Sequence, residues 1–174
     1  QAGHLALSAG IAGGADVILI PEIPYDIARI VQKIEDVSQD EKRNHALIVC
    51  AEAACPKDGE AVYAEQSGHK VYGGIAHKLG HDIHTLSGAE TRVTVLGHLQ
   101  RGGSPSSFDR VLASSFGVYA VDLLASGVFG RMVSWWDGSV RDVDLSTVVD
   151  KEKSVNLMGS RMRAARGLGI CFGD

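Results

Sequence analysis

The chain contains three short runs rich in apolar, β-branched residues, and segments with helical spacing lie between them. The runs are 16–20 (DVILI), 46–51 (ALIVCA) and 91–96 (TRVTVL). Runs this short and this apolar are typical of strands that are buried on both faces of a parallel sheet. Between the first two, residues 26–38 repeat isoleucine and valine at helical spacing. The alternation predicts an α/β fold with a mostly parallel sheet flanked by helices.

The remaining segments extend this pattern without a repeat or a linker. Helices are predicted over 4–12, 26–38, 71–86, 106–126 and 161–168, and further strands over 131–135 and 139–143. The polar, glycine-bearing residues 55–68 predict a surface loop. With 174 residues, of which 45% are hydrophobic and 22% charged, the chain has the size and composition of one folded domain.

Charge and cysteine content exclude several classes of protein. The formal net charge is −4, and no basic block offers a surface for nucleic acid or for an anionic membrane. The apolar runs are too short to span a bilayer. The three cysteines are irregularly spaced, which indicates a reducing, cytoplasmic setting and no disulfide framework.

Polar residues that follow the predicted strands are the first candidates for a site, because ligands of parallel sheets bind at the carboxyl ends of the strands. Glu22 follows the first strand and Glu52 the second. Glu52 is placed where it can hydrogen-bond a sugar hydroxyl, and the alternative is a surface glutamate at the start of a loop.

The turn 97–105 (GHLQRGGSP) after the third strand is the richest of these places. His98 and Arg101 are flanked by glycines, which allow the backbone to approach a ligand closely. Ser104-Pro105 predicts the start of the next helix, whose positive end would face the turn. Together these features indicate an anion site, most naturally for a phosphate, and Arg92 adds a further charge. The alternative is a plain glycine corner with solvated His98 and Arg101.

Two other site types are less favoured by the sequence. Neither a G-x-x-x-x-G-K-[ST] loop nor a G-x-G-x-x-G fingerprint is present, which argues against a nucleotide-cradling loop and against a dehydrogenase. His77, His81 and His84 have a spacing that can bind zinc, but no H-E-x-x-H arrangement or cysteine pair completes the set. Histidines on an amphipathic helix are the commoner explanation.

Residues 90–114 (ETRVTVLGHLQRGGSPSSFDRVLAS) resemble the signature of the phosphofructokinase family over twenty-five residues in register. Residues 3–22 are similar to the family's helix and strand that follow its M-G-R segment. Residues 47–52 (LIVCAE) are similar to the strand that carries the family's sugar-binding glutamate. Residues 167–174 (GLGICFGD) resemble the C-terminus of the branch that uses either ATP or pyrophosphate.

The resemblance implies that residues 1–174 are the C-terminal, fructose 6-phosphate-binding part of an enzyme that phosphorylates that sugar at its 1-hydroxyl. It implies that His98 holds the 6-phosphate and that Arg101 contacts the sugar phosphate and stabilises the transferring charge. It also implies that Glu52 hydrogen-bonds the sugar hydroxyls. Arg92 would reach the phosphate from a neighbouring subunit, which requires a homo-oligomer, a dimer or a tetramer.

The resemblance also implies what lies elsewhere. Asp16 matches a position that binds the magnesium of an allosteric nucleotide in some bacterial relatives, and 41–43 (EKR) keeps part of the matching basic stretch. The family's donor loop and catalytic aspartate precede the matched region, so Mg²⁺ with ATP or pyrophosphate would be bound mainly upstream. We therefore expect no catalytic residue and no turnover in this chain alone. The donor stays open, and a non-catalytic sugar-phosphate-binding module is the alternative.

Overall fold

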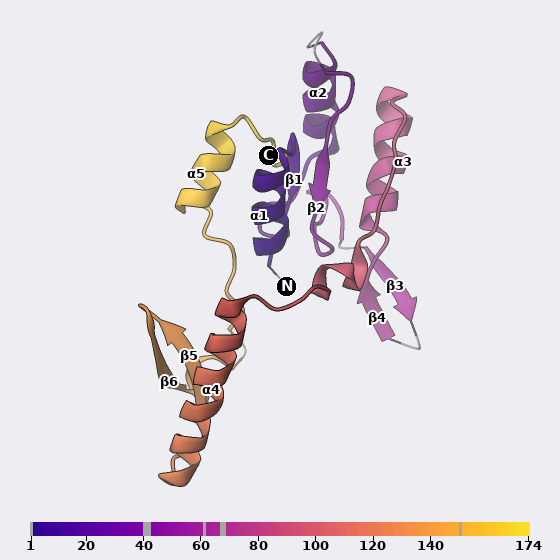
Figure 1. Ribbon diagram of the computed structural model, residues 1–174. Coiled ribbons are helices and arrows are strands. Elements are labelled where there is room, and N and C mark those ends of the chain that lie inside the picture. The colour runs from indigo at the N-terminus through magenta and orange to yellow at the C-terminus, as the bar shows by residue number, and fades with distance from the viewer. Residues whose placement is uncertain (1, 40–42, 61, 67–68, 150) are drawn as a thin grey trace. The chain divides into compact units, whose positions relative to one another are not determined.

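The computed structural model describes residues 2–39, 43–60, 62–66, 69–149 and 151–174, and it divides into two compact units. Unit 1 comprises Gln1–Val95 and Lys153–Asp174, and unit 2 comprises Leu96–Glu152. In unit 1 the elements are α1 (His4–Gly13), β1 (Val17–Leu19), α2 (Ile27–Ser38), β2 (Ile48–Cys50), β3 (Tyr63–Gln66), β4 (His69–Tyr72), α3 (Ile75–Ser87) and α5 (Ser160–Gly167) (Figure 1). In unit 2 they are the 3₁₀ helix η1 (Gly97–Arg101), α4 (Ser107–Ala125), β5 (Arg131–Trp136), β6 (Ser139–Asp144) and the 3₁₀ helix η2 (Leu145–Thr147).

A short parallel sheet forms the centre of unit 1. β1 pairs with β2 from Val17 opposite Ile48 to Leu19 opposite Cys50. On its other edge, β1 meets the C-terminal segment, where Val17 is bridged in parallel to Cys171. The residues of β1 are fully buried, as expected for a central strand. The predicted α/β class and the first two strands are therefore confirmed.

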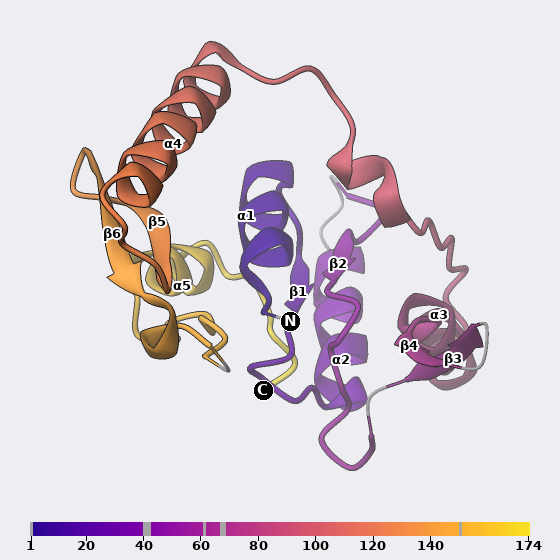
Figure 2. The same cartoon turned by 90° about the horizontal axis from the view of Figure 1, so that it is seen from below.

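Helices cover both faces of this sheet. Ile18 and Ile20 pack into a core with residues of α1 and α5, whereas Val17 and Leu19 pack into a second core with residues of α2 and α3. Figure 2 shows α1 on one side of β1 and α2 on the other. Because side chains alternate across a strand, three residues of β1 are enough to join the two cores.

The helix boundaries follow local capping chemistry. α1 ends at Gly13, and Gly14 takes a left-handed conformation with φ of 69° that only glycine adopts without cost. At the start of α2, the Asp26 carboxylate accepts a 2.8 Å hydrogen bond from Ala28 N. The predicted ends of these two helices are confirmed within one residue.

Two local predictions in unit 1 are wrong. Residues 91–96 form no strand, and Val95 and Leu96 are exposed, because no strand in the described part of the chain lies beside them to complete a ladder. Within the predicted loop 55–68, β3 pairs with β4 in an antiparallel hairpin whose register joins Tyr63 to Tyr72. The loop was predicted from the polar composition of this segment, but the segment also contains aromatic and β-branched residues, which favour strand pairing. α3 accordingly begins only at Ile75, after Gly74.

Unit 2 consists of α4 packed on the β5–β6 hairpin. Asp137 and Gly138 form the two-residue turn with φ of 49° and 77°, between Trp136 and its partner Ser139. Positive φ at both central residues is the turn geometry that Asp-Gly favours. This confirms the predicted strand after 137–138. The Tyr119 hydroxyl of α4 donates a 2.8 Å hydrogen bond to Asp142 of β6.

One face of α4 is apolar and exposed. None of its nineteen residues is buried, and Val111, Val118 and Val121 are 66%, 64% and 63% exposed. We expect the purified chain to self-associate through this face, because contiguous exposed apolar surface favours association. Sedimentation at increasing concentration should detect oligomers that the double change Val118→Lys, Val121→Lys disperses. Met158→Lys, at an exposed position off α4, is the control, and a chain that stays monomeric at every concentration would contradict the expectation.

Candidate functional site

The carboxyl edge of the parallel sheet carries two glutamates with different surroundings. Glu52 lies in the turn that follows β2, and its side chain is exposed. Glu22 lies in the turn after β1, where its carboxylate accepts hydrogen bonds from Gly3 N at 3.1 Å and from Val155 N at 2.8 Å. Glu52 is therefore accessible to a ligand, whereas Glu22 is engaged by the protein's own backbone.

Arg92 lies in the extended segment that follows α3. Its guanidinium donates to the carboxylate of Glu90 at 3.0 Å, and the Arg92 side chain is 89% exposed. Ion pairs this exposed contribute little free energy, so the guanidinium can exchange Glu90 for an anionic ligand.

The glycine-rich turn is a 3₁₀ helix, η1, and it presents His98 to solvent. Gly97 and Gly103 have φ of 51° and 106°, conformations that require glycine on either side of the histidine. The side chain of Arg101 lies outside what the structure describes.

The predicted contribution of the helix that follows this turn is corrected by the structure. α4 is capped by Ser106, not by Ser104, and Pro105 precedes the cap. The Asp109 carboxylate accepts a 2.8 Å hydrogen bond from Ser106 N, while the Ser106 hydroxyl accepts one from Asp109 N at 3.2 Å. Hydrogen bonds to the Asp109 carboxylate from the Ser106 hydroxyl, at 2.7 Å, and from Ser106 N hold the pKa of Asp109 below its usual value.

The carboxylate of Asp109 thus lies at the positive end of α4. The sequence predicts a bound phosphate at this position. The S-x-x-D pattern at 106–109 is the sequence signal that would have placed the cap correctly.

The predicted substrate-binding residues are distributed over both units. Glu52 and Arg92 belong to unit 1, and His98 and Arg101 belong to unit 2. Within its own unit, each of the three described side chains is exposed. Their convergence on one ligand stays a prediction.

Asp16, the predicted effector contact, is buried and bound by neighbouring donors. Arg43 donates to its two oxygens at 2.8 and 2.9 Å, and Leu47 N donates at 2.8 Å. Burial raises the pKa of this carboxyl, but the hydrogen bonds from Arg43 and Leu47, with the charges of Arg43 and Lys33, outweigh burial and lower the pKa overall. Asp16, Lys33 and Arg43 border a hollow of about 280 Å³ that Asp36 and 168–170 also line.

We expect Asp16→Asn to lower the free energy of unfolding by about 1.5–3 kcal/mol, because it removes charge-assisted hydrogen bonds. The folded-state pKa is depressed, so the stabilisation is present above the unfolded-state value near 3.8 and is lost as the pH falls through the folded value. Urea unfolding between pH 7 and pH 2.5 should show a smaller acid loss for Asp16→Asn than for the wild type. Equal acid losses would contradict this.

Metal ligands do not gather in the part of the chain that the structure describes. No group of three or more histidine, cysteine or acidic side chains is placed there to hold a metal ion. On α3, His84 is engaged locally, with Nδ1 3.0 Å from the carbonyl oxygen of Ala89. Among the described residues, no such cluster is therefore available to a magnesium ion. Over the same described residues, no helix has the length and apolarity needed to cross a bilayer.

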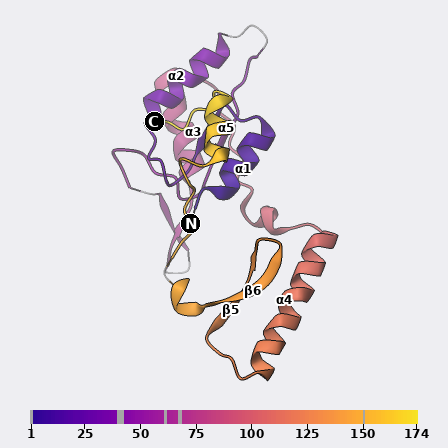
Figure 3. The ribbon, with the colours of Figure 1, turned by 90° about the vertical axis from the view of Figure 1, so that its left-hand side faces the viewer.

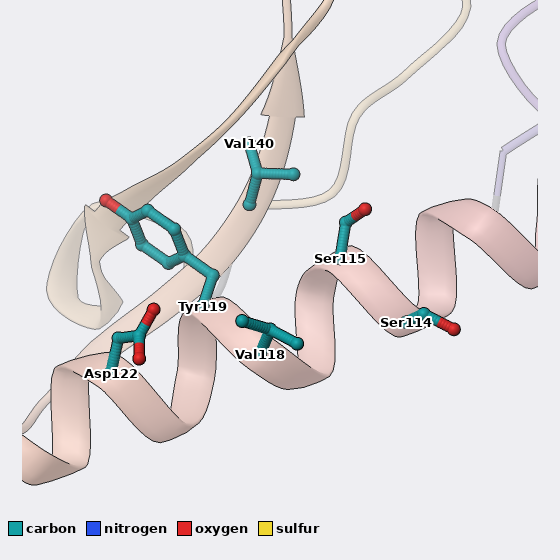
Figure 4. Close-up of a pocket in the computed structure, with 6 residues that line it drawn as sticks. All are labelled: Ser114, Ser115, Val118, Tyr119, Asp122 and Val140. Atoms are coloured by element: carbon teal, nitrogen blue, oxygen red, sulfur yellow. The ribbon is translucent and has the colours of Figure 1, made fainter.

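A shallow groove of about 390 Å³ lies on unit 2. It is lined by Ser114, Ser115, Val118, Tyr119, Asp122 and Val140, from α4 and β6 (Figure 4). None of the predicted site residues lines it, and it lies on the helix whose apolar face is exposed. We assign it no ligand.

Comparison with known proteins decides the family. The family model described as Phosphofructokinase matches residues 1–124. The chain belongs to the phosphofructokinase family. This confirms the resemblance read from residues 90–114.

The relatives of this phosphofructokinase-family chain match it from end to end. It is 49% identical over 175 residues to ATP-dependent 6-phosphofructokinase 1 of Synechocystis sp., covering 100% of this chain and 48% of the relative. It is 44% identical to ATP-dependent 6-phosphofructokinase 2 of Clostridium perfringens, covering 100% of this chain and 49% of the relative. The chain thus spans about half the length of the curated relatives it matches.

Solved structures share the fold. The pyrophosphate-dependent phosphofructokinase from Nitrosospira multiformis matches with a TM-score of 0.71 at 22% identity, covering 99% of this chain and 46% of that one. At this identity the match supports the arrangement of helices and strands only.

Proposed function

We propose that the complete protein is a 6-phosphofructokinase that transfers a phosphoryl group to the 1-hydroxyl of fructose 6-phosphate, and that this chain supplies the sugar-phosphate contacts. The observation that carries the proposal is His98, exposed on a turn that Gly97 and Gly103 shape, inside the segment that carries the family resemblance. Relatives that match the whole chain at 44–49% identity are named ATP-dependent 6-phosphofructokinases.

The roles of the side chains follow from their chemistry. His98 and Arg101 donate charge-assisted hydrogen bonds to the 6-phosphate, and Glu52 accepts hydrogen bonds from the sugar hydroxyls. Arg92, exposed and paired with an exposed glutamate, contacts the 6-phosphate of a neighbouring subunit. The protein is therefore a homo-oligomer in this proposal.

The phosphoryl donor is ATP in this proposal, because the matching relatives bear that name. Pyrophosphate is the alternative. Mg²⁺ accompanies either donor and neutralises its charge, but the described residues of this chain form no site for it, so we derive no step through the ion. The three cysteines are free, which fits a reducing, cytoplasmic setting.

Two assays test the proposal. The complete protein should phosphorylate fructose 6-phosphate with ATP and Mg²⁺, and replacing ATP with pyrophosphate identifies the donor. Calorimetric titration of fructose 6-phosphate into the 174-residue chain should show whether the acceptor contacts function alone, with His98→Ala as the specificity control. No turnover of fructose 6-phosphate with either donor would overturn the proposal. Binding by the chain without turnover by the complete protein would favour the non-catalytic module.

A further inference from the structure

The carboxylate of Glu22 joins two segments that are distant in sequence. Glu22 Oε1 accepts hydrogen bonds from Val155 N at 2.8 Å, across 133 residues, and from Gly3 N at 3.1 Å, across 19 residues. Oε2 is also 3.1 Å from Gly3 N. Charge-assisted hydrogen bonds to a partly buried carboxylate are stronger than neutral ones, so this junction is a firm one.

A second contact fastens the same segment. His4 Nε2 lies 2.7 Å from the carbonyl oxygen of Lys153 and donates to it in the tautomer protonated at Nε2. The start of α1 and the segment 153–155 are thus held by a side-chain contact from His4 and by the shared carboxylate of Glu22. In Figure 3, the segment that leads into α5 runs beside the start of α1.

The packing at this junction leaves no room for adjustment. A Cβ atom on Gly3 would lie 2.3 Å from Ile20 Cγ2 and 2.9 Å from Glu22 Oε2, so only glycine allows this approach. Val155 is 6% exposed and belongs to the same core cluster as Ile20. Apolar burial therefore holds the side chain of Val155 while Glu22 holds its backbone.

The junction lies where the chain returns from unit 2 to unit 1. The chain leaves unit 1 after Val95 and returns to it at Lys153. At the first crossing, residues 91–96 form no helix or strand, and Val95 and Leu96 are 64% and 54% exposed. At the second crossing, Glu22 and His4 bind the backbone directly. The second crossing is therefore held at its backbone by Glu22 and His4, whereas the hydrogen bond from Thr91 Oγ1 to the carbonyl oxygen of Gly80, at 3.3 Å, lies before the exposed residues of the first crossing.

We propose that Glu22 is a positioning residue: it anchors the second crossing and thereby restrains residues 96–152, which carry His98, without touching the sugar phosphate itself. The effect on the substrate rests on the proposed function. If the anchor is loosened, residues 96–152 have more conformational freedom, and substrate binding has to restrict it. This loss of conformational entropy weakens substrate binding more than it slows the chemical step.

Hydrogen exchange on the 174-residue chain tests the anchor directly. In Glu22→Gln, the amides of Gly3 and Val155 should exchange at least about tenfold faster, while those of β1 keep their protection. Glu35→Gln, the same change at an exposed position on α2, should leave all of these rates unchanged. Unchanged exchange at Val155 in Glu22→Gln would overturn the proposal.

Kinetics of the complete protein test the consequence. Glu22→Gln should raise KM for fructose 6-phosphate about three- to tenfold with little change in kcat, a split that a general loss of stability would not produce. His4→Ala, which removes only the contact to Lys153, should act in the same direction and serves if Glu22→Gln does not fold. Faster exchange with an unchanged KM would show that the anchor is merely local and would overturn the proposed role. If the wild type does not turn over fructose 6-phosphate, the proposed function fails, and hydrogen exchange alone decides whether Glu22 is the anchor.

Discussion

The His98→Ala variant of the complete enzyme is expected to lose about tenfold or more in kcat/KM for fructose 6-phosphate. A charge-assisted hydrogen bond to a phosphate contributes about 1.5–3 kcal/mol, and removing it should appear in full in this ratio. The histidine is exposed, so its loss should leave the free energy of unfolding nearly unchanged. By the sequence argument alone, Arg101→Ala should behave similarly. Steady-state kinetics at varied sugar phosphate, with a parallel thermal melt, separate the two effects.

The matched control is His81→Ala, the same substitution at an exposed histidine on α3. Its kinetics should equal those of the wild type. If His98→Ala also kept its kcat/KM, the assignment of the phosphate contact to this turn would be wrong, whatever the family of the protein.

The second large effect is expected on the free energy of unfolding. In α1, replacing glycine by alanine should lower it at one position and raise it at another. Gly10→Ala places a Cβ atom 2.4 Å from Ile18 Cδ1 and 2.5 Å from Ile18 Cγ1, and Ile18 is fully buried and has no space to move. Overpacking of this kind costs about 1–3 kcal/mol. Gly13→Ala meets no atom within 4 Å and should stabilise the helix by about 0.5–1 kcal/mol.

Urea denaturation of both variants measures the difference directly. Because both changes are Gly→Ala in α1, effects on the unfolded chain cancel in the comparison. Equal stabilities would show that α1 does not pack on β1 as closely as Gly10 requires.

Local sequence patterns predicted much of the secondary structure. The apolar run at 16–20 predicted β1, the glycines at 13–14 predicted the end of α1, and Asp137-Gly138 predicted the hairpin turn. Each of these was predicted from neighbouring residues only, because the backbone conformation favoured by a glycine and the apolar, β-branched composition of a run are properties of a short segment. The strand predicted at 91–96 depended on a partner strand, which residue pattern does not specify.

The same division holds for the site. Sequence by itself determined the family, the glycine-flanked turn that carries His98 and the glutamate that follows β2, because these rest on residue type and local spacing. Only the tertiary structure decided that Arg43 binds Asp16 and that Glu22 holds Val155. Those contacts join groups that are separated by 27 and 133 residues, and a carboxylate bonds whichever donors the packed core brings to it.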